Sequence, residues 1–211
     1  MKEEVYKVNE VFYSLEGEGL FQGKAMVFIR LSGCNLDCEW CDTKFDVSRS
    51  ATARQLLQEA KQYPTDTAII TGGEPLMQPI KELIWTFRQA GYQVHIQTNG
   101  MFELPCSVDW LVVSPKNRSL HPTIIRAVDE LKFLCGIDRW IELITELLRD
   151  FNFQHRAYIY LMPLALGWRM EPGFRDARGI VPNTVKMAVE YCKDHPEVRL
   201  CMQMHKVVGI R

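Results

Sequence analysis

Three cysteines stand close together near residue 34, and their spacing limits what this part of the chain can form. Cys34, Cys38 and Cys41 are separated by three and then by two residues, and Trp40 directly precedes the last of them. Three thiolates at such spacing suit a soft metal centre. The next cysteine, Cys106, is far away, so the loop lacks the second close pair of a structural zinc site. A four-iron cluster held by three cysteines leaves one iron open to a small molecule, so the spacing predicts a catalytic centre.

Short apolar runs alternate with helical segments along the rest of the chain. In parallel α/β structures, loops that carry polar groups meet at the C-terminal ends of the strands. A chain of 211 residues is barely long enough for a complete eight-fold barrel. We therefore expect an α/β fold, a partial, open TIM-like barrel of about six parallel strands with reduced helices, as a single domain over residues 1–211. The expected strands are 26–31, 66–71, 92–97, 110–113, 131–135 and 157–162, with 198–203 closing the set.

Several helices have recognisable start signals. Thr52 and Gln55 have the form of a capping box, which predicts a helix to about residue 62. Asp138 is expected to cap a second helix that runs to about residue 149, with Ile141 facing the core. Apolar residues at helical spacing predict further helices near 80–90 and 183–193.

Composition excludes several classes of protein. Lys plus Arg is 25 against 26 for Asp plus Glu, and no block of like charge indicates a nucleic-acid or membrane surface. The first ten residues lack the apolar core of a signal peptide, and no window approaches a membrane span. Seven cysteines are an odd number, with three clustered, which favours a reducing, cytoplasmic setting over a disulfide framework. The other four are expected to be small buried hydrophobes.

The cysteine spacing with its adjacent aromatic residue resembles that of the radical S-adenosylmethionine (SAM) superfamily. The turn Gly72-Gly73-Glu74-Pro75, which follows an expected strand, resembles the superfamily motif that binds the methionyl amino group. The resemblance implies a radical SAM core, a [4Fe-4S] cluster and SAM. It also implies a 5′-deoxyadenosyl radical that abstracts hydrogen from the substrate, chemistry that belongs to the cofactor while the protein supplies position and excludes water.

Further motifs narrow the resemblance to the 7-carboxy-7-deazaguanine synthase family. They occur in the family's order and are FYSLEGEG at 12–19, FIRL at 28–31, CDT at 41–43, TGGEP at 71–75, TNG at 98–100, SPK at 114–116 and QMHK at 203–206. The resemblance implies a lyase that converts 6-carboxy-5,6,7,8-tetrahydropterin to 7-carboxy-7-deazaguanine with loss of ammonia, on the route to queuosine and other 7-deazapurines. The implied reaction begins with hydrogen abstraction from C6 of the pterin and is assisted by Mg²⁺.

The resemblance also implies roles for individual residues of this chain. It implies that Cys34, Cys38 and Cys41 hold the cluster and that Thr43 binds Mg²⁺, which seldom receives an all-protein cage. The implied SAM-binding residues are Trp40, Gly72, Gly73, Glu74, Gln97, Ser114, Pro115, Lys116 and Met162. The implied substrate-binding residues are Leu15, Glu16, Gly17, Arg30 and Thr71.

Three positions depart from the family pattern. Many relatives have glutamine where this chain has Glu16 and glutamate where it has Gln97, and Met162 stands in place of a glutamine before the proline. The first departure changes a contact with the pterin edge from amide to carboxylate. For Lys116 and Lys132, a salt bridge inside the barrel is the competing interpretation. Arg30, inside an apolar run, needs either a substrate carboxylate or an internal acid.

Other functions remain as alternatives on the sequence. A glycyl-radical activase shares the cysteine spacing but acts on a protein, and the loop could also belong to an iron–sulfur electron carrier or a zinc module. His205 is compatible with either packing or catalysis. The family resemblance implies a homodimer and a flavodoxin-type reductant as partners, besides the pterin.

Overall fold

The computed structural model describes residues 3–43, 48–153, 157–165 and 181–210. In these residues nine strands form one sheet in the order β3-β1-β2-β4-β5-β6-β7-β8-β9. The strands from β2 onward pair in parallel, whereas β1 is antiparallel to both of its neighbours. The strands are β1 (Val5–Leu15), β2 (Ala25–Leu31), β3 (Arg49–Thr52), β4 (Thr67–Gly72), β5 (Gln93–Thr98), β6 (Trp110–Val113), β7 (Glu130–Cys135), β8 (Tyr158–Pro163) and β9 (Val198–Leu200).

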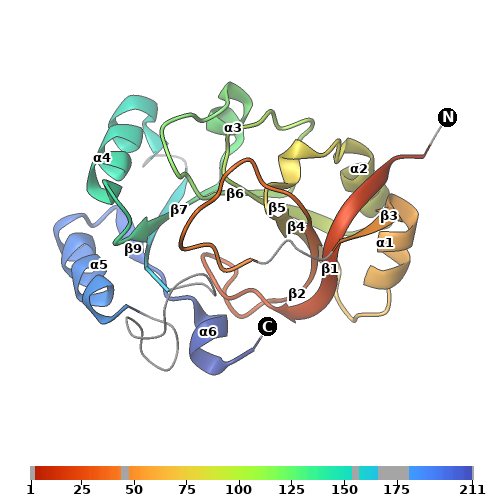
Figure 1. Cartoon of the computed structure of the whole chain (residues 1–211), viewed down its shortest axis with the longest axis horizontal. Helices are drawn as coiled ribbons and strands as arrows, with labels where there is room; N and C mark the ends of the chain where they lie inside the picture. Colours follow the sequence, from red (N-terminus) through yellow and green to blue (C-terminus); the bar gives the residue numbers. More distant parts are fainter. Residues whose placement is uncertain (1–2, 44–47, 154–156, 166–180, 211) are drawn as a thin grey trace.

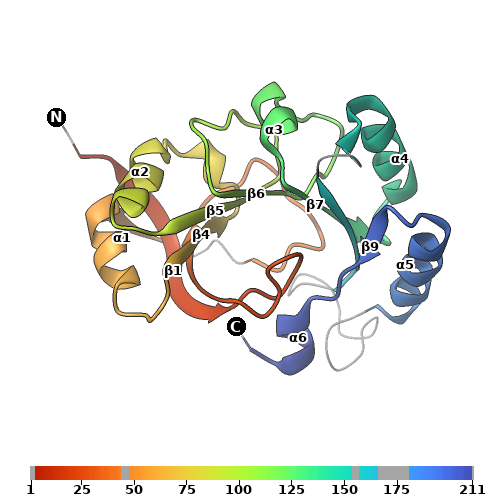
Figure 2. The same ribbon diagram turned by 180° about the vertical axis from the view of Figure 1, so that it is seen from behind.

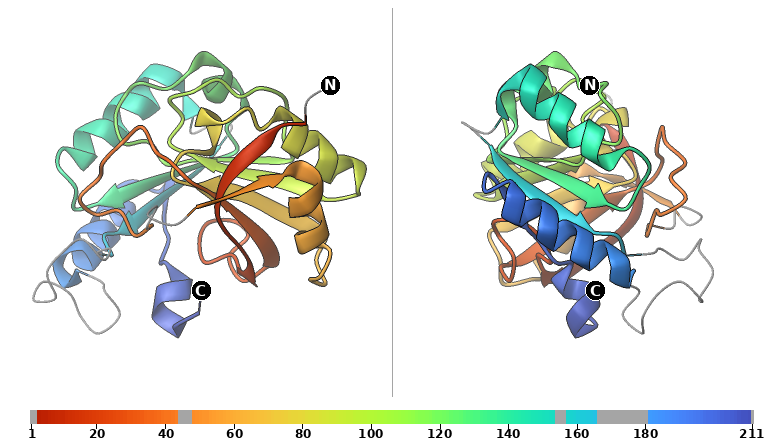
Figure 3. Two further views of the ribbon diagram at one scale, coloured as in Figure 1. Left: turned by 45° about the vertical axis from the view of Figure 1, so that its right-hand side comes forward. Right: turned by 90° about the vertical axis from the view of Figure 1, so that its left-hand side faces the viewer.

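The sheet curves into an open barrel with helices on its outer side (Figure 1, Figure 2). The helices are α1 (Ala53–Ala60), η1 (Pro75–Met77), α2 (Lys81–Gln89), α3 (Pro122–Ala127), α4 (Trp140–Phe151), α5 (Pro182–Asp194) and α6 (Met204–Val208). Figure 3 shows α4 and α5 on the same outer side of the sheet. Strands with the barrel interior on one face and helices on the other are buried on both faces, and all residues of β4 except Gly72 are buried.

The open parallel barrel predicted from the sequence is confirmed: in the described residues its parallel part consists of the six main expected strands and the closing strand β9. The antiparallel edge strand β3 was not predicted, because its four residues, Arg49–Thr52, have no apolar alternation. Thr52 and Gln55 form the predicted capping box at the start of α1. The last expected strand is shorter than predicted: β9 ends at Leu200, and the following residues lead into the short helix α6.

The start of α4 corrects one prediction. The residue that caps this helix is Arg139 in the left-handed conformation, and Asp138 lies before it. The helix therefore begins at Trp140, and its buried face consists of Trp140, Ile144 and Leu147. Ile141, predicted to face the core, is 48% exposed. Trp140, not Ile141, anchors the first turn, because its large ring fills the core side of the helix.

The loop between β1 and β2 fills one end of the barrel. The loop after β2, which carries Cys34, Cys38 and Cys41 and is called the cysteine loop below, lies at the opposite end. Since β1 runs antiparallel to β2, its end at Leu15 lies beside the start of β2, at the N-terminal ends of the parallel strands. Phe21 of this loop packs on His95 of β5 and Trp110 of β6, at 4.8 and 5.0 Å between ring centroids. We call residues 16–22 the floor loop. It closes one end of the barrel.

The C-terminal segment lies between the two ends of the open sheet (Figure 1). The backbone N–H of Met204 donates to the Gly17 carbonyl at 2.9 Å, and Gln22 Nε2 donates to the Met202 carbonyl at 2.9 Å. Residues from β9 onward are thereby joined to the floor loop. This contact connects the two edges of the barrel, which do not pair as strands. No helix among the described residues is long and apolar enough to cross a membrane.

Candidate active site

A cavity of about 460 Å³ occupies the interior of the barrel between the cysteine loop and the floor loop. Of the cluster, Mg²⁺, SAM and substrate residues that the family resemblance implies, all but Glu74 and Pro115 line it. Those that do are Cys34, Cys38, Cys41, Thr43, Trp40, Gly72, Gly73, Gln97, Ser114, Lys116, Met162, Leu15, Glu16, Gly17, Arg30 and Thr71. The structure thus brings together residues that are spread over most of the sequence.

The three cysteines of the loop after β2 all border the cavity as half-buried free thiols. No three His, Cys, Asp or Glu side chains in the described part of the chain are close enough to bind a single metal ion. A four-iron cluster is larger than one ion and is held by thiolates at its corners, so three cysteines around a cavity fit it. Burial raises the pKa of the Cys34 and Cys38 thiols, and binding iron would displace their protons.

The Gly72-Gly73 turn lies directly against the base of the cysteine loop. Gly73 N–H donates to the Leu31 carbonyl at 3.2 Å, and Glu74 N–H donates to the Gly33 carbonyl at 2.8 Å. A Cβ on Gly73 would lie 2.0 Å from the Gly33 carbonyl oxygen, and a Cβ on Gly72 would lie 2.1 Å from that of Leu31. Only glycine allows the two backbones to approach so closely.

Glu74 has a structural position behind the cavity wall. It is completely buried, and its carboxylate accepts hydrogen bonds from Leu76 N–H at 2.9 Å, from Thr98 Oγ1 at 2.7 Å and from Asn99 N–H at 2.7 Å. The side chain of Asn99 in turn donates to Asn35 of the cysteine loop at 2.9 Å. Glu74 therefore connects the turns after β4 and β5 instead of facing the cavity.

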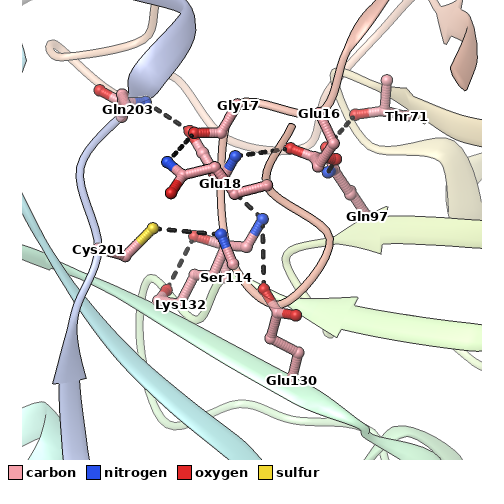
Figure 4. Close-up of polar contacts among 12 residues, drawn as sticks. Glu16, Gly17, Glu18, Thr71, Gln97, Ser114, Glu130, Lys132, Cys201 and Gln203 are labelled. Carbon is pink, nitrogen blue, oxygen red and sulfur yellow. Dashed lines mark hydrogen bonds and ion pairs between the residues drawn. The ribbon is translucent and has the colours of Figure 1, made fainter. Parts of the chain in front are cut away.

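A short hydrogen-bond chain leads from the barrel wall to the floor loop (Figure 4). Thr71 Oγ1 donates to Gln97 Oε1 at 3.2 Å, and Gln97 Nε2 donates to Glu16 Oε2 at 2.8 Å. The other carboxylate oxygen of Glu16 accepts from Glu18 N–H at 3.0 Å. Burial raises the pKa of Glu16 to about 6, and the charge of Lys132 opposes part of this effect.

Arg30 lies between the sheet edge and the end of the cysteine loop. Its Nε forms an ion pair with Glu10 at 2.9 Å, so the structure supplies the internal acid that the sequence requires. A second guanidinium nitrogen donates to Thr43 Oγ1 at 3.1 Å. Asp42, next to Thr43, binds Lys206 of α6 at 2.8 Å between Oδ2 and Nζ. The guanidinium of Arg30 and the hydroxyl of Thr43 are thus neighbours on this side of the cavity.

Lys116 contributes a positive charge near the cysteines, and it is hydrogen-bonded to Ser114. Lys116 Nζ donates to the Ser114 carbonyl at 2.9 Å, and Ser114 Oγ donates to the Lys132 carbonyl at 3.1 Å. Burial lowers the pKa of Lys116, while the thiol of Cys38 opposes the shift. The competing prediction of a salt bridge inside the barrel holds for Lys132, which pairs with Glu18 and Glu130, and Lys116 bonds to Ser114.

The comparisons with known proteins agree with the geometry of the site. Residues 28–108 match the model of the Radical SAM superfamily. A 7-carboxy-7-deazaguanine synthase of Bacteroides thetaiotaomicron is 37% identical over 206 residues, covering 97% of this chain and 98% of that protein. A protein of the same name from Haemophilus influenzae is 30% identical, at 97% and 94% coverage. The chain belongs to the 7-carboxy-7-deazaguanine synthase family.

Solved structures agree with this assignment. The crystal structure of Escherichia coli QueE superimposes with a TM-score of 0.78 at 28% identity, over 95% of each chain. Streptococcus suis SuiB bound to SAM shares the fold at a TM-score of 0.51 and 16% identity, over 80% of this chain and 48% of that one. The predicted radical SAM partial barrel is therefore confirmed, and the protein is a member of an enzyme family.

Two of the departures from the pattern of 7-carboxy-7-deazaguanine synthases are physically linked. On the sequence, Glu16 and Gln97 stand 81 residues apart and look like independent changes. In the structure they are hydrogen-bonded to each other, with one carboxylate and one amide. The carboxylate of this pair belongs to the floor loop and the amide to β5.

Several residues of the cavity were given no definite role from the sequence. Glu18 and Gln203 line it and bind each other at 2.7 Å, and His205 lies against Gly17, where a Cβ would come within 2.0 Å of its ring nitrogen. Burial lowers the pKa of His205, which favours the neutral ring. The QMHK motif was a usable signal for Gln203 and His205, but it did not indicate their partners.

The buried carboxyl of Glu16 predicts a pH-dependent contribution to stability. Its pKa is raised from 4.5 to about 6 in the folded state, so the folded protein retains a proton that the unfolded chain releases. The free energy of unfolding therefore falls as pH rises through this window, by about 2 kcal/mol for this group. In Glu16→Gln, stability relative to wild type should increase by about this amount between pH 4.5 and pH 7.

Urea unfolding of both proteins across this pH range, followed by tryptophan fluorescence, measures the difference. Glu142→Gln, at an exposed position on α4, is the control for loss of a carboxyl at the surface. A pH-independent difference between Glu16→Gln and wild type would show that the carboxyl of Glu16 ionises equally in the two states.

Proposed function

We propose that this protein converts 6-carboxy-5,6,7,8-tetrahydropterin to 7-carboxy-7-deazaguanine with loss of ammonia, as a radical SAM lyase. The observation that supports this most is that one cavity connects the cysteine loop at one end with Arg30 and Glu16 farther inside. Its size suits a small substrate beside a cofactor. The names of the full-length relatives point to the same reaction.

Residues at the cysteine end of the cavity would hold the cluster and SAM. Cys34, Cys38 and Cys41 would bind the iron, and the Gly72-Gly73 backbone would lie next to the cofactor. When bound, the cluster and SAM supply the radical chemistry that removes a hydrogen atom from C6 of the pterin. Apolar cavity residues, among them Leu134 and Met162, would exclude water from the reacting centre.

Residues deeper in the cavity would orient the pterin. Phe12 and Phe28 line it as a stacked pair with centroids 4.8 Å apart, a flat apolar wall against which a planar ring can pack. The guanidinium of Arg30 would bind the substrate carboxylate. Both oxygens of Glu16 are fixed by hydrogen bonds, and each retains a lone pair that can accept from an N–H of the ring edge.

Thr43 and its neighbours fit a Mg²⁺ ion that contacts the substrate. Its hydroxyl faces the cavity beside Arg30, and Asp42 supplies a second oxygen 3.5 Å away. Hard cations prefer such oxygen ligands and complete their shell with water and substrate. We also infer a homodimer, a flavodoxin-type reductant and a cytoplasmic setting; family membership supports all three.

Turnover under anaerobic conditions tests the proposal. The cluster-loaded protein is given SAM, Mg²⁺, a reductant and 6-carboxytetrahydropterin, and the deazaguanine product is sought by mass spectrometry. Tetrahydropterin without the carboxylate is the matched control, and it should be turned over at least about 100-fold less efficiently because it cannot form the proposed charged contact with Arg30. Cleavage of SAM without any product from the carboxylated pterin would contradict the proposed substrate.

A further inference from the structure

Lys132 is the one described lysine that lies completely inside the barrel, between two acidic side chains at the floor of the cavity (Figure 4). Its Nζ is 3.3 Å from Glu18 Oε2 and 3.4 Å from Glu130 Oε1. We propose that Lys132 is a positioning residue for the substrate: it holds the floor loop, through Glu18, in the conformation that presents Glu16 to the cavity. This inference rests on the proposed function.

The position of Lys132 in strand β7 explains why its ammonium group lies next to the floor loop. Glu130, Lys132 and Leu134 alternate along the strand, so their side chains point to the same face, toward the barrel interior. Leu134 lines the main cavity, whereas Glu130 and Lys132 border a smaller one beneath it, next to Phe21 of the floor loop. Lys132 therefore lies at the level where the floor loop meets the sheet.

Both acids that bind Lys132 also hold the floor loop. Glu18 is part of the loop, and its other oxygen accepts from Gln203 at 2.7 Å. Glu130 belongs to the sheet, and its Oε2 accepts from the backbone N–H of Leu20 at 3.2 Å. Its Oε1 has no hydrogen-bond partner in the described residues, so the ammonium is its counter-ion. β7 thus holds the loop at two points, through the ion pair of Lys132 with Glu18 and through the hydrogen bond of Leu20 to Glu130.

The charge balance at the floor makes this ammonium hard to replace. Three buried or nearly buried carboxylates, those of Glu16, Glu18 and Glu130, surround one lysine. Without the cation their mutual repulsion and the cost of burial are no longer offset, and the side chain of Glu18, which Lys132 binds directly, would point elsewhere. Glu18 N–H also donates to Glu16, so a shift of Glu18 moves the carboxylate that would bind the pterin edge.

The loop has little space for alternative positions. A Cβ at Gly19 would lie 1.8 Å from Glu130 Oε1, and the residue has a φ of +69°, a backbone conformation that favours glycine. The N–H of Gly19 donates to the thiol of Cys201 at 3.2 Å. The backbone of the loop is thus packed directly onto Glu130, and the side-chain contacts of Lys132 decide where Glu18 points.

A double-mutant cycle between Lys132 and Glu18 tests the inference. The variants Lys132→Met, Glu18→Gln and the double variant are compared with wild type for KM of the carboxylated pterin and for the rate of SAM cleavage without substrate. Lys132→Met should raise KM at least about tenfold and leave SAM cleavage within about twofold of wild type. Since Lys132 acts through Glu18, adding Lys132→Met to Glu18→Gln should raise KM by less than about twofold more.

Two controls separate positioning from loss of stability. Leu147→Ala, in the buried face of α4 and far from the floor loop, lowers stability and should leave KM unchanged. If Lys132→Met does not fold, the comparison of Glu18→Gln with the double variant still decides, because the double variant removes one buried charge of each sign. Independent, multiplicative effects of the two changes, or a normal KM in Lys132→Met, would overturn the inference. Absence of product from wild type would instead contradict the proposed function.

Discussion

Replacing Cys38 by alanine is expected to abolish cluster binding, SAM cleavage and product formation together. Three thiolates are the only protein ligands that the cysteine loop offers the cluster, and each borders the cavity. Loss of one leaves two irons without a protein ligand. The fold should survive, because the side chain is only half-buried and belongs to a surface loop. We expect at least about a 1000-fold loss of turnover with a change in unfolding free energy below about 1 kcal/mol.

Absorption spectroscopy and iron content after anaerobic reconstitution measure the first effect, and mass spectrometry measures turnover. Cys106→Ala is the matched control, because Cys106 is also a half-buried free thiol but lies outside the cavity. It should retain the brown colour, the iron and the activity. A Cys38→Ala protein that holds a four-iron cluster and forms product would show that this cysteine is not a ligand.

Gly73→Ala is expected to disrupt the same centre without touching a cysteine. The new Cβ would lie 2.0 Å from the Gly33 carbonyl oxygen, 2.6 Å from its carbon and 3.0 Å from Cys34 Cβ. Two of these atoms are backbone, so the contact can be relieved only if the cysteine loop and the turn after β4 move apart. That movement breaks the hydrogen bond from Glu74 N–H to the Gly33 carbonyl. We expect SAM affinity to fall at least about 100-fold, equivalent to about 3 kcal/mol.

Equilibrium dialysis with SAM on the cluster-loaded protein measures this affinity directly. Gly91→Ala is the control: Gly91 has a φ of +89°, a Cβ added there would meet no described atom within 4 Å, and the residue is remote from the cavity. Only the backbone strain of about 1–2 kcal/mol should appear there, as reduced stability with unchanged SAM affinity. Equal affinities of Gly73→Ala and wild type would show that the close approach of the two loops is not needed to bind SAM.

The sequence predicted residues that the structure gathers around one cavity, but it did not predict their contacts with one another. The motifs carry residue identities, and every predicted cluster ligand lies at the cavity. Glu74 is an example: its motif implies a cofactor contact through the backbone, and the structure adds that the carboxylate accepts hydrogen bonds from Leu76, Thr98 and Asn99. The sequence of the turn is the same whether the carboxylate contacts a cofactor or stabilises neighbouring turns. Its role depends on what the neighbouring strand brings beside it.

The sequence alone determined the features that depend on residues near one another in the chain. The capping box at Thr52 and the apolar runs of the parallel strands are local patterns, and they predicted the start of α1 and the strands, except that β9 ends at Leu200. Only the tertiary structure decided that β1 runs antiparallel and turns the floor loop into the barrel, that Gln97 binds Glu16, and that Lys132 lies between two acids. These pairs are distant in sequence, and the energy of a buried charge or amide depends on partners that only the folded sheet brings within reach.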